Sequence, residues 1–386
     1  MRGGDGWLVE RRRGDDLVLT YRAAMLLRLL TSWDYVRVWR ALCEVGFEAS
    51  LDDVRRWLCC ERPHLTPTVL EKSLYYHEAY RLVLAVAAEH PDWRHKKMAG
   101  YVSSLLPIGI PALTAYYWMK GLSRPNITPV KPCPALGYLV GVLIGDRKRT
   151  ESGCGLAVKD REFAEYYARM YEKVTGVRLK VHSTEDGYYR TYERAAWLKE
   201  LWCSGLWKVV AYAYPTEFLK GLYDSEGYIA PIVVDEEKRV SSVVIGLATG
   251  NAELKEFVKK RLAELGLSPR ERYEAPRKRT LRGKTYTFGG SWKLRLVGWD
   301  KLERFAELIG FREGKRRRRL ELLLRIRHLP PKERYKQWTK YYVKDPKRSL
   351  GRKSSKPPSR TTLGPTCQVG PTLRFLSLLT YSVNQK

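Results

Sequence analysis

The sequence predicts an α+β protein in which an all-α region precedes two similar halves of mixed helix and strand. A motif with a tryptophan, an Arg-Pro pair and a Thr-Pro pair occurs twice before residue 130, each time after a helical pattern. A proline-rich linker follows at 125–135. Beyond it, two apolar helices that end in acids each lead into alternating strands and amphipathic helices, which indicates an internal repeat.

The composition favours a globular protein with a polyanionic partner. Of the 386 residues, 71 are Lys or Arg, 42 are Asp or Glu, and 44% are hydrophobic. The resulting net charge of +29 opposes compaction unless a polyanion neutralises it, and nucleic acid is the usual one. Charge alone does not exclude a general RNA-binding protein.

The chain is expected to work inside the cell and away from membranes. No apolar run approaches the ~20 residues that a membrane span needs, and the N-terminus lacks a signal-peptide stretch. The seven cysteines include no CxxC pair, as expected for reduced thiols. We therefore expect a cytoplasmic, nucleoid-associated prokaryotic protein, and its three Asn and three Gln are typical of a thermophilic source.

The repeated N-terminal motif indicates two helix-turn-helix units. The helices predicted for the two copies are Tyr35–Phe47 with Leu51–Leu58, and Lys96–Leu106 with Pro111–Lys120. In the alternative interpretation these are plain helical hairpins with Trp57 and Trp118 in the core. The second copy, with Lys120 on its exposed face, favours DNA contact; the first copy, with Asp52 and Asp53, leaves the two interpretations evenly balanced.

Two apolar helices end in carboxylates. The first, at 136–146, has glycines at every fourth position and ends in Asp146; the second, at 218–227, has small residues at the matching places and ends near Glu226. Four-residue spacing places the glycines on one helix face, which allows close packing of two helices. The paired acids would then emerge together and repel each other unless divalent cations bridge them.

These segments resemble the paired motifs of the single-chain LAGLIDADG homing endonucleases, with Leu139–Arg147 as the first motif and Leu219–Gly227 as the second. The resemblance, to the two-motif, archaeal intron-encoded type, implies two pseudo-symmetric αββαββα halves that form a DNA-binding saddle. It implies metal-dependent cleavage of both DNA strands, with Mg²⁺, or another divalent cation such as Mn²⁺, bound by Asp146 and Glu226. Lys159 matches the family's basic residue near the metal.

The chain departs from the family pattern in three places. Arg147 stands where the family has a glycine after the first acid, and the two acids lie only 80 residues apart. The stretch 246–250 contains no lysine to match Lys159. These departures predict an asymmetric or weakened enzyme.

Alternating and amphipathic patterns predict the same order of elements after each acid-tipped helix. In the first half they are the strand Cys154–Lys159, the helix Arg161–Thr175, the strands Val177–His182 and Tyr188–Glu193 around an Asp186-Gly187 turn, and the helix Ala195–Leu201. In the second half they are the strands Tyr228–Val234 and Arg239–Thr249, the helix Ala252–Leu265, a basic hairpin of Arg270–Leu281 with Lys284–Leu296, and the helix Asp300–Ile309.

Basic and aromatic side chains on the outward faces of these strands are predicted to contact DNA, together with the arginine run of Gly314–Arg319. Any single one of them could equally be part of a solvated strand face. The predicted DNA-contact residues are Lys120, Arg178, Lys180, His182, Tyr188, Arg190, Tyr192, Arg239, Arg272, Arg277, Lys278, Arg279, Arg282, Lys284, Tyr286, Lys293, Arg295, Arg316 and Arg317.

The predicted domain order has five parts. They are 1–95 with the first helix-turn-helix copy, 96–131 with the second copy and linker, 132–215 and 216–329 as the two halves, and 330–386 as a basic, largely disordered tail. We expect a monomer with internal pseudo-two-fold symmetry that acts on a double-stranded DNA target site. Two alternatives remain open on the same scaffold: a non-cutting DNA-binding regulator, and a maturase that binds its own intron RNA.

Overall fold

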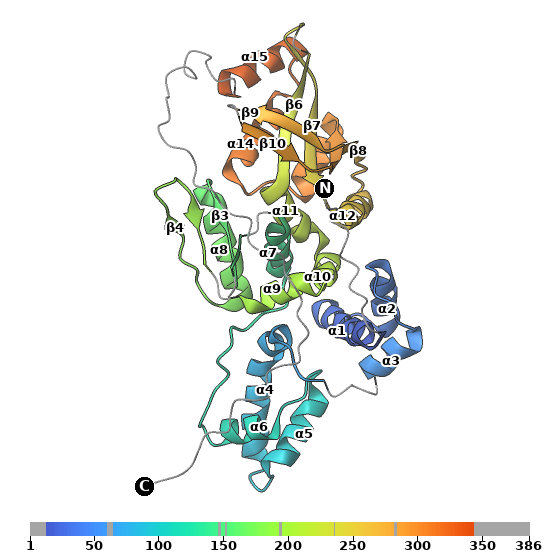
Figure 1. Cartoon of the computed structure of the whole chain (residues 1–386), viewed down its shortest axis with the longest axis vertical. Helices are drawn as coiled ribbons and strands as arrows, with labels where there is room; N and C mark the ends of the chain where they lie inside the picture. Colours follow the sequence, from blue (N-terminus) through green and yellow to red (C-terminus); the bar gives the residue numbers. More distant parts are fainter. Residues whose placement is uncertain are drawn as a thin grey trace. The chain divides into compact units, whose positions relative to one another are not determined.

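The described part of the chain combines helices with antiparallel sheets, which confirms the predicted α+β class. The computed structural model describes residues 13–59, 65–145, 148–150, 153–192, 195–234, 236–281 and 284–342 (Figure 1). The described residues from Arg13 to Tyr341 belong to one compact unit. Within the described ranges, no helix is both long and apolar enough to cross a membrane.

The N-terminal region consists of two three-helix modules. The first contains α1 (Arg13–Thr31), α2 (Tyr35–Glu44) and α3 (Leu51–Cys59), and the second contains α4 (Val69–Glu89), α5 (His95–Leu105) and α6 (Ala112–Met119). Trp57 of α3 packs edge-on against Tyr21 of α1, with ring centres 5.6 Å apart. Trp118 of α6 packs in the same way against Tyr76 of α4, at 5.5 Å. The repeated tryptophans are therefore core residues, and a long first helix belongs to each repeat.

The helix α4 shares one hydrophobic core with α5 and α6. Ala79 and Val83 of α4 pack there with Met98 of α5 and Ala115 of α6. The sequence interpretation assigned α4 to the region of the first copy, because its apolar pattern is continuous and carries no marker of the repeat. The core groups it with the second copy instead.

The remaining elements form two halves and a C-terminal helical segment. The first half contains α7 (Pro134–Gly145), β1 (Lys148–Thr150), β2 (Gly153–Gly155), β3 (Ala157–Val158), α8 (Arg161–Thr175), β4 (His182–Ser183), β5 (Tyr189–Arg190), α9 (Ala196–Cys203) and α10 (Trp207–Ala213). The second half contains α11 (Pro215–Glu226), β6 (Gly227–Val234), β7 (Arg239–Thr249), α12 (Ala252–Glu264), β8 (Arg270–Glu274), β9 (Arg277–Leu281), β10 (Lys284–Phe288), β11 (Ser291–Val297) and α13 (Trp299–Leu308). Helices α14 (Gly314–Ile326) and α15 (Pro331–Tyr342) follow.

The helices α7 and α11 pack through their glycines, as the four-residue spacing predicted. A Cβ atom added at Gly141 would overlap the carbonyl oxygen of Phe218, and one added at Gly221 would overlap that of Tyr138. Only glycine permits this approach of the two backbones. The contact fixes the two helices side by side at the centre of the two halves.

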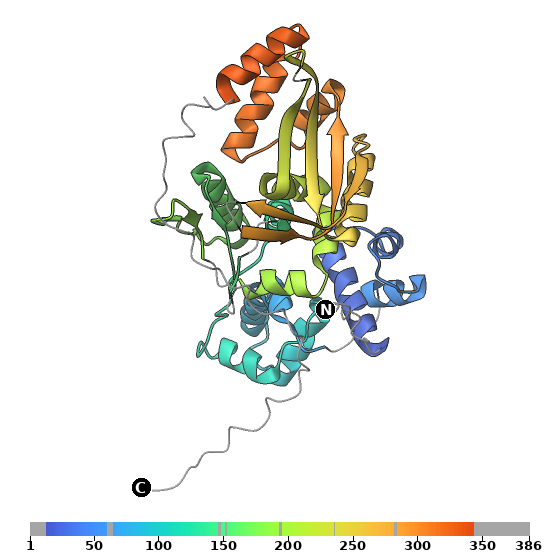
Figure 2. The same ribbon diagram turned by 45° about the horizontal axis from the view of Figure 1, so that its top comes forward.

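The two halves share a strand order. The second half has a four-stranded antiparallel sheet in the order β6-β7-β11-β8, of which β6, β7 and β11 lie side by side in Figure 2. The first half has a three-stranded sheet in the order β3-β5-β4 and a separate β1-β2 pair. The helix between the strands is capped in both halves, because Asp160 accepts from the Phe163 amide at 2.8 Å and Asn251 from the Leu254 amide at 3.0 Å.

Several predicted strands are shorter than their patterns suggested. Of the predicted strand Val177–His182 only His182 lies in β4, and the side chain of Val177 is 46% exposed, so the alternating pattern there has no core to face. The basic hairpin of residues 270–296 is divided into β8 with β11 and β9 with β10. Ala275-Pro276 and Gly289-Gly290 interrupt it, since proline lacks an amide donor and glycine weakens a strand.

The predicted disordered tail begins with a helix, so that prediction is wrong for residues 331–342. The Arg334 guanidinium of α15 lies 4.5 Å from the ring centre of Trp299, and Arg327 forms an ion pair with Glu303 beside it. These contacts hold the segment after α14 against α13. Residues 343–386, with the rest of the predicted tail, lie outside the described residues.

Candidate nucleic-acid and metal site

The side chain of Glu226, at the C-terminal end of α11, is partly exposed. The last residue of α7, Gly145, lies against this end, because a Cβ atom added there would overlap the Ser225 side chain and come within 2.8 Å of Cγ of Glu226. The structure therefore brings the C-terminal ends of both acid-tipped helices together. Asp146 and Arg147 lie outside the described residues.

An arginine from α14 supports this end of α11. The guanidinium of Arg316 donates to the carbonyl oxygens of Asp224 and Ser225, the latter at 3.0 Å. These oxygens belong to the last turn of α11, where the helix supplies no amide donors. Partial burial raises the pKa of Glu226, and the positive charge of Arg316 opposes that rise.

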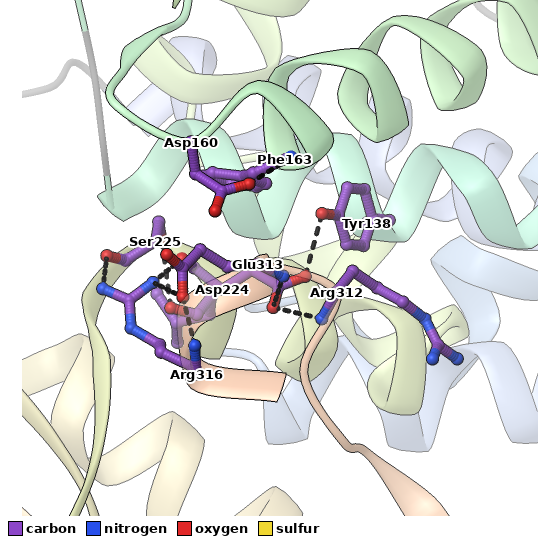
Figure 3. Close-up of polar contacts among 9 residues, drawn as sticks. Tyr138, Asp160, Phe163, Asp224, Ser225, Arg312, Glu313 and Arg316 are labelled. Atoms are coloured by element: carbon purple, nitrogen blue, oxygen red, sulfur yellow. Dashed lines mark hydrogen bonds and ion pairs between the residues drawn. The ribbon is translucent and has the colours of Figure 1, made fainter. Parts of the chain in front are cut away.

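A buried aspartate connects α11 to both α7 and the start of α14 (Figure 3). Asp224 is completely buried; its Oδ1 accepts from the amides of Arg312 at 2.7 Å and Glu313 at 3.0 Å, and its Oδ2 accepts from the Tyr138 hydroxyl at 2.9 Å. Burial raises the pKa of Asp224 to about 6, although the three hydrogen bonds favour the charged form. Burial, and then the neighbouring carboxylate, raise the pKa of Tyr138.

Asp224 was absent from the sequence prediction. The available signal was an acid two residues before Glu226, at a position where the first helix has Ile144. That asymmetry indicated a role specific to the second half. The chain pattern could not show which groups would surround the side chain.

The predicted basic residue Lys159 is exposed and follows β3 directly. Its Nζ lies 5.2 Å from the ring centre of Tyr188, which is the contact that the structure gives for it. The structure records no contact between Lys159 and Glu226 within the described ranges. Its catalytic role therefore stays a prediction.

Basic side chains of the four-stranded sheet form a ladder between β8 and β11. Lys293 lies opposite Arg272, and Arg295 lies opposite Arg270. Residues opposite each other in antiparallel strands share a face, so four cations occupy one face of the sheet. Leu294, the residue between, is completely buried on the other face, as the alternation predicted. Like charges directly opposite each other destabilise a sheet, and a polyanion would remove that cost.

The other predicted DNA-contact residues differ in their exposure and in whether they form ion pairs. In the first half Arg178, Lys180, His182 and Tyr192 are exposed, while Tyr188 and Arg190 are half-buried. Several of the predicted cations form ion pairs: Arg190 with Asp186, Arg239 with Glu237, Arg277 and Lys293 with Glu274, and Arg317 with Glu162. Lys120 is exposed in the second three-helix module, Arg282 lies outside the described residues, and the side chains of Lys278, Arg279, Lys284 and Tyr286 are not described.

A cleft of about 530 Å³ lies between α8 and the segment that leads into α14. Its lining residues are Glu162, Glu165, Tyr166, Arg169, Arg312 and Arg317. The guanidinium carbons of Arg169 and Arg312 lie 5.5 and 6.0 Å from the ring centre of Tyr166. Within the described part of the chain, no three His, Cys, Asp or Glu side chains gather as a metal site, in this cleft or elsewhere.

Two related halves that meet through glycine-faced helices, with an exposed acid at the shared end, define a LAGLIDADG-type α+β fold. Residues 213–310, from the end of α10 to the turn after α13, match the sequence model of the LAGLIDADG-like domain. Residues 213–310 are thus similar to a LAGLIDADG-like domain, which agrees with the resemblance of the second motif, Leu219–Gly227. The first motif, Leu139–Arg147, lies outside the matched residues.

Other relatives extend the comparison along the chain. An uncharacterized protein of Methanocaldococcus jannaschii, MJ0398, is 28% identical over 278 residues, which are 66% of this chain and 96% of the relative. The crystal structure of I-DmoI in complex with DNA and Mn is 17% identical, covers 46% of this chain and 96% of its own, and has a TM-score of 0.30. The homing endonuclease I-WcaI bound to its DNA recognition sequence is 14% identical, covers 46% and 80%, and has a TM-score of 0.26.

Proposed function

We propose that this protein is a site-specific endonuclease that cleaves both strands of a DNA duplex with the aid of a divalent cation. The observation that carries the proposal is the packing of α7 on α11, which sets Gly145 against Ser225 and Glu226. Asp146 follows Gly145 directly in the sequence. The two acids of the two motifs would therefore share one site at the end of the helix pair.

The donor set at this end fits Mg²⁺ or Mn²⁺. Glu226 offers the carboxylate of a partly exposed side chain, and Asp146 would offer a second one. Magnesium binds in proteins through one or two carboxylates and completes its shell with phosphate oxygens and water. When bound, the cation would lower the pKa of an attacking water and neutralise charge that develops on the scissile phosphate.

The protein's own residues would supply binding and orientation. Glu226 must be ionised to bind a cation, and the nearby Arg316 favours that ionised form. Arg316 also holds the carbonyls of the last turn of α11, which orients Glu226. The cations of β8 and β11, among them Arg272 and Lys293, would bind DNA phosphates and set the register of the duplex on the sheet.

Intron homing is the biological role that this activity would serve, and the target would be the gene sequence without the intron. A regulator on the same scaffold would bind this duplex without cutting it. A maturase would bind the intron RNA in preference to the duplex. The same assay separates these roles.

The test incubates the full chain with a duplex of the uninterrupted insertion site, in Mg²⁺ and in a chelator. We expect double-strand cleavage only with the metal. Glu226→Gln and Asp146→Asn should bind the duplex with unchanged affinity and lose cleavage by at least about a hundredfold, since each removes a charged ligand. Glu217→Gln, which changes an acid in the first turn of the same helix, is the matched control and should cut normally. Cleavage by either Glu226→Gln or Asp146→Asn would overturn the metal assignment.

A further inference from the structure

The two N-terminal modules correspond residue by residue. Aligning Trp57 with Trp118 also aligns Val54 with Ala115, and both of these side chains are completely buried. The turns before α3 and α6, at 45–50 and 106–111, then have the same length. The exposed positions of the third helices correspond as well; they hold Asp52, Arg55, Arg56 and Cys59 in α3, and Leu113, Tyr116, Tyr117 and Lys120 in α6.

The two modules have opposite electrostatic character. Residues 93–124 contain five Lys or Arg and no Asp or Glu, whereas the aligned residues 32–63 contain five Arg and six Asp or Glu. The first turn of α3 contains Asp52 and Asp53, and the first turn of α6 contains no acid. A recognition helix meets DNA through its N-terminal residues, so acids at that end repel the phosphates.

Among the described residues, the cations of 93–124 have no carboxylate partner, whereas Arg81 of α4 forms an ion pair with Glu78. Arg94, Lys96, Lys97, Lys120 and Arg124 are exposed, and none forms an ion pair with a carboxylate in the described part of the chain. In the first module Arg37 pairs with Asp34 and Arg56 with Asp53. Residues 93–124 therefore keep their positive charge available for phosphates, while acids neutralise part of the charge in the first module.

The exposed face of α6 has the chemistry of a base-reading surface. Leu113 is 59% exposed, Tyr116 is 37% exposed and Tyr117 is 41% exposed, so three large side chains lie together on the solvent-facing side of α6. Aliphatic and aromatic side chains contact thymine methyl groups in the major groove, and a tyrosine hydroxyl can bond to base edges. Lys120 at the end of the helix would contact the backbone.

The first module has a packing role against the two halves. Glu44 of α2 binds Lys260 and Arg261 of α12, at 2.9 and 3.3 Å. Trp33, before α2, packs edge-on against Tyr212 of α10, with ring centres 6.0 Å apart. The aligned positions of the second module, Leu105 and Arg94, are exposed. The second module packs on the first half through α4 instead, where the Leu70 amide donates to Glu200 at 2.9 Å.

We propose that the second module, residues 69–124, is a separate duplex-DNA-binding unit whose helix α6 enters the major groove, and that the first module braces the two halves. This surface extends recognition beyond the sheet face. DNA binding by this surface requires no metal, so it can be tested independently of the proposed cleavage.

The test compares matched substitutions in the full chain. Binding to a random-sequence DNA duplex is measured without divalent metal over a range of salt concentrations. Lys120→Ala should lower the slope of log affinity against log salt by about 1, because one phosphate contact is lost. Arg55→Ala, which removes an exposed cation from the aligned face of α3, should leave the slope unchanged.

A second measurement tests base reading by α6. Sequences selected from a random duplex pool by the wild type should contain a block of bases that Tyr117→Ala no longer selects, with about tenfold weaker binding to the wild-type sequence. Arg56→Ala, at the aligned position of α3, should select the same sequence as the wild type. Tyr117 is exposed, and an unchanged thermal melting curve would show that the variant folds.

The outcomes are distinct. Equal effects of Lys120→Ala and Arg55→Ala on the salt slope, or no effect of either, would overturn the assignment. An unchanged selected sequence in Tyr117→Ala would also overturn it, and is the result expected if α6 docks on a protein. A chain that never cuts DNA but shows the contrast between the two modules would refute the nuclease proposal and retain this one.

Discussion

The hydroxyl of Tyr138 in α7 donates a hydrogen bond of 2.9 Å to Oδ2 of Asp224 in α11, inside the interface between the two helices. Both side chains are completely buried. The other carboxylate oxygen of Asp224 accepts from the amides of Arg312 and Glu313, just before α14. One buried aspartate thus joins the helix pair to the C-terminal helices, two residues away from the exposed Glu226.

Asp224→Asn should make the protein more stable at pH 8 and remove its pH dependence between pH 4 and pH 6. The pKa of Asp224 in the folded state is about 6, above the ordinary aspartate value of 3.8, so folding favours the protonated form. The stabilisation from protonation is complete below pH 3.8 and is lost as the pH rises through 6, a difference of about 3 kcal/mol. Chemical unfolding at pH 5 and pH 8 measures the part of this difference that is lost above pH 5, about 1.4 kcal/mol. An unchanged pH slope in the variant would contradict the assignment.

Tyr138→Phe should destabilise the protein by about 1–3 kcal/mol, because it removes one partner from a buried carboxylate. The control is Tyr166→Phe, since the Tyr166 ring packs edge-on against Tyr138, 5.0 Å away, and its hydroxyl is outside this network. That control should change stability by less than about 0.5 kcal/mol. Equal effects of both substitutions in urea unfolding would contradict a specific contribution from the hydrogen bond between Tyr138 and Asp224.

Gly141→Ala should separate α7 from α11 and lower stability by about 2 kcal/mol or more, because the new methyl group meets the backbone of Phe218. Gly100→Ala is the matched control, since Gly100 lies within α5 and an added Cβ there meets nothing within 4 Å. It should raise stability by up to about 1 kcal/mol through helix propensity. Thermal unfolding of both variants checks the pair, and a neutral Gly141→Ala would refute the close approach.

Arg272→Ala should weaken DNA binding with little change in the stability of the fold. Arg272 faces Lys293 across two strands, and Glu274 offsets part of their repulsion because it pairs with Lys293. Removal of Arg272 therefore costs the free protein little and removes a phosphate contact in the complex. The slope of log affinity against log salt should fall by about 1. Lys259→Ala is the comparison, because Lys259 of α12 pairs with Glu271 at 2.9 Å and should not affect binding. A slope that changes only in Lys259→Ala would place the DNA on the other face.

Local sequence patterns correctly predicted the helices and strands that pack against a hydrophobic core. The helix α8 begins and ends at the predicted residues, with Asp160 as its N-cap and Gly176 at a left-handed φ of 74° after it. The strand β7 also has the predicted bounds, and its centre from Val243 to Leu247 is buried. Val177–His182 carries an equally regular pattern but lacks a packing partner, so most of it is not a strand. An alternating pattern predicts which side chains of a strand share a face. It does not predict whether another element packs on that face.

The glycine faces of α7 and α11, the acids at their ends and the repeated tryptophans could be read from local spacing alone, because periodic spacing along the chain fixes which side chains share a helix face. Only the tertiary structure decided what surrounds Asp224, since its amide partners lie 88 and 89 residues further along the chain. It also decided that Arg316 holds the end of α11 and that α4 packs with α5 and α6. Contacts over such separations depend on how whole elements pack, and local residue patterns carry no record of that packing.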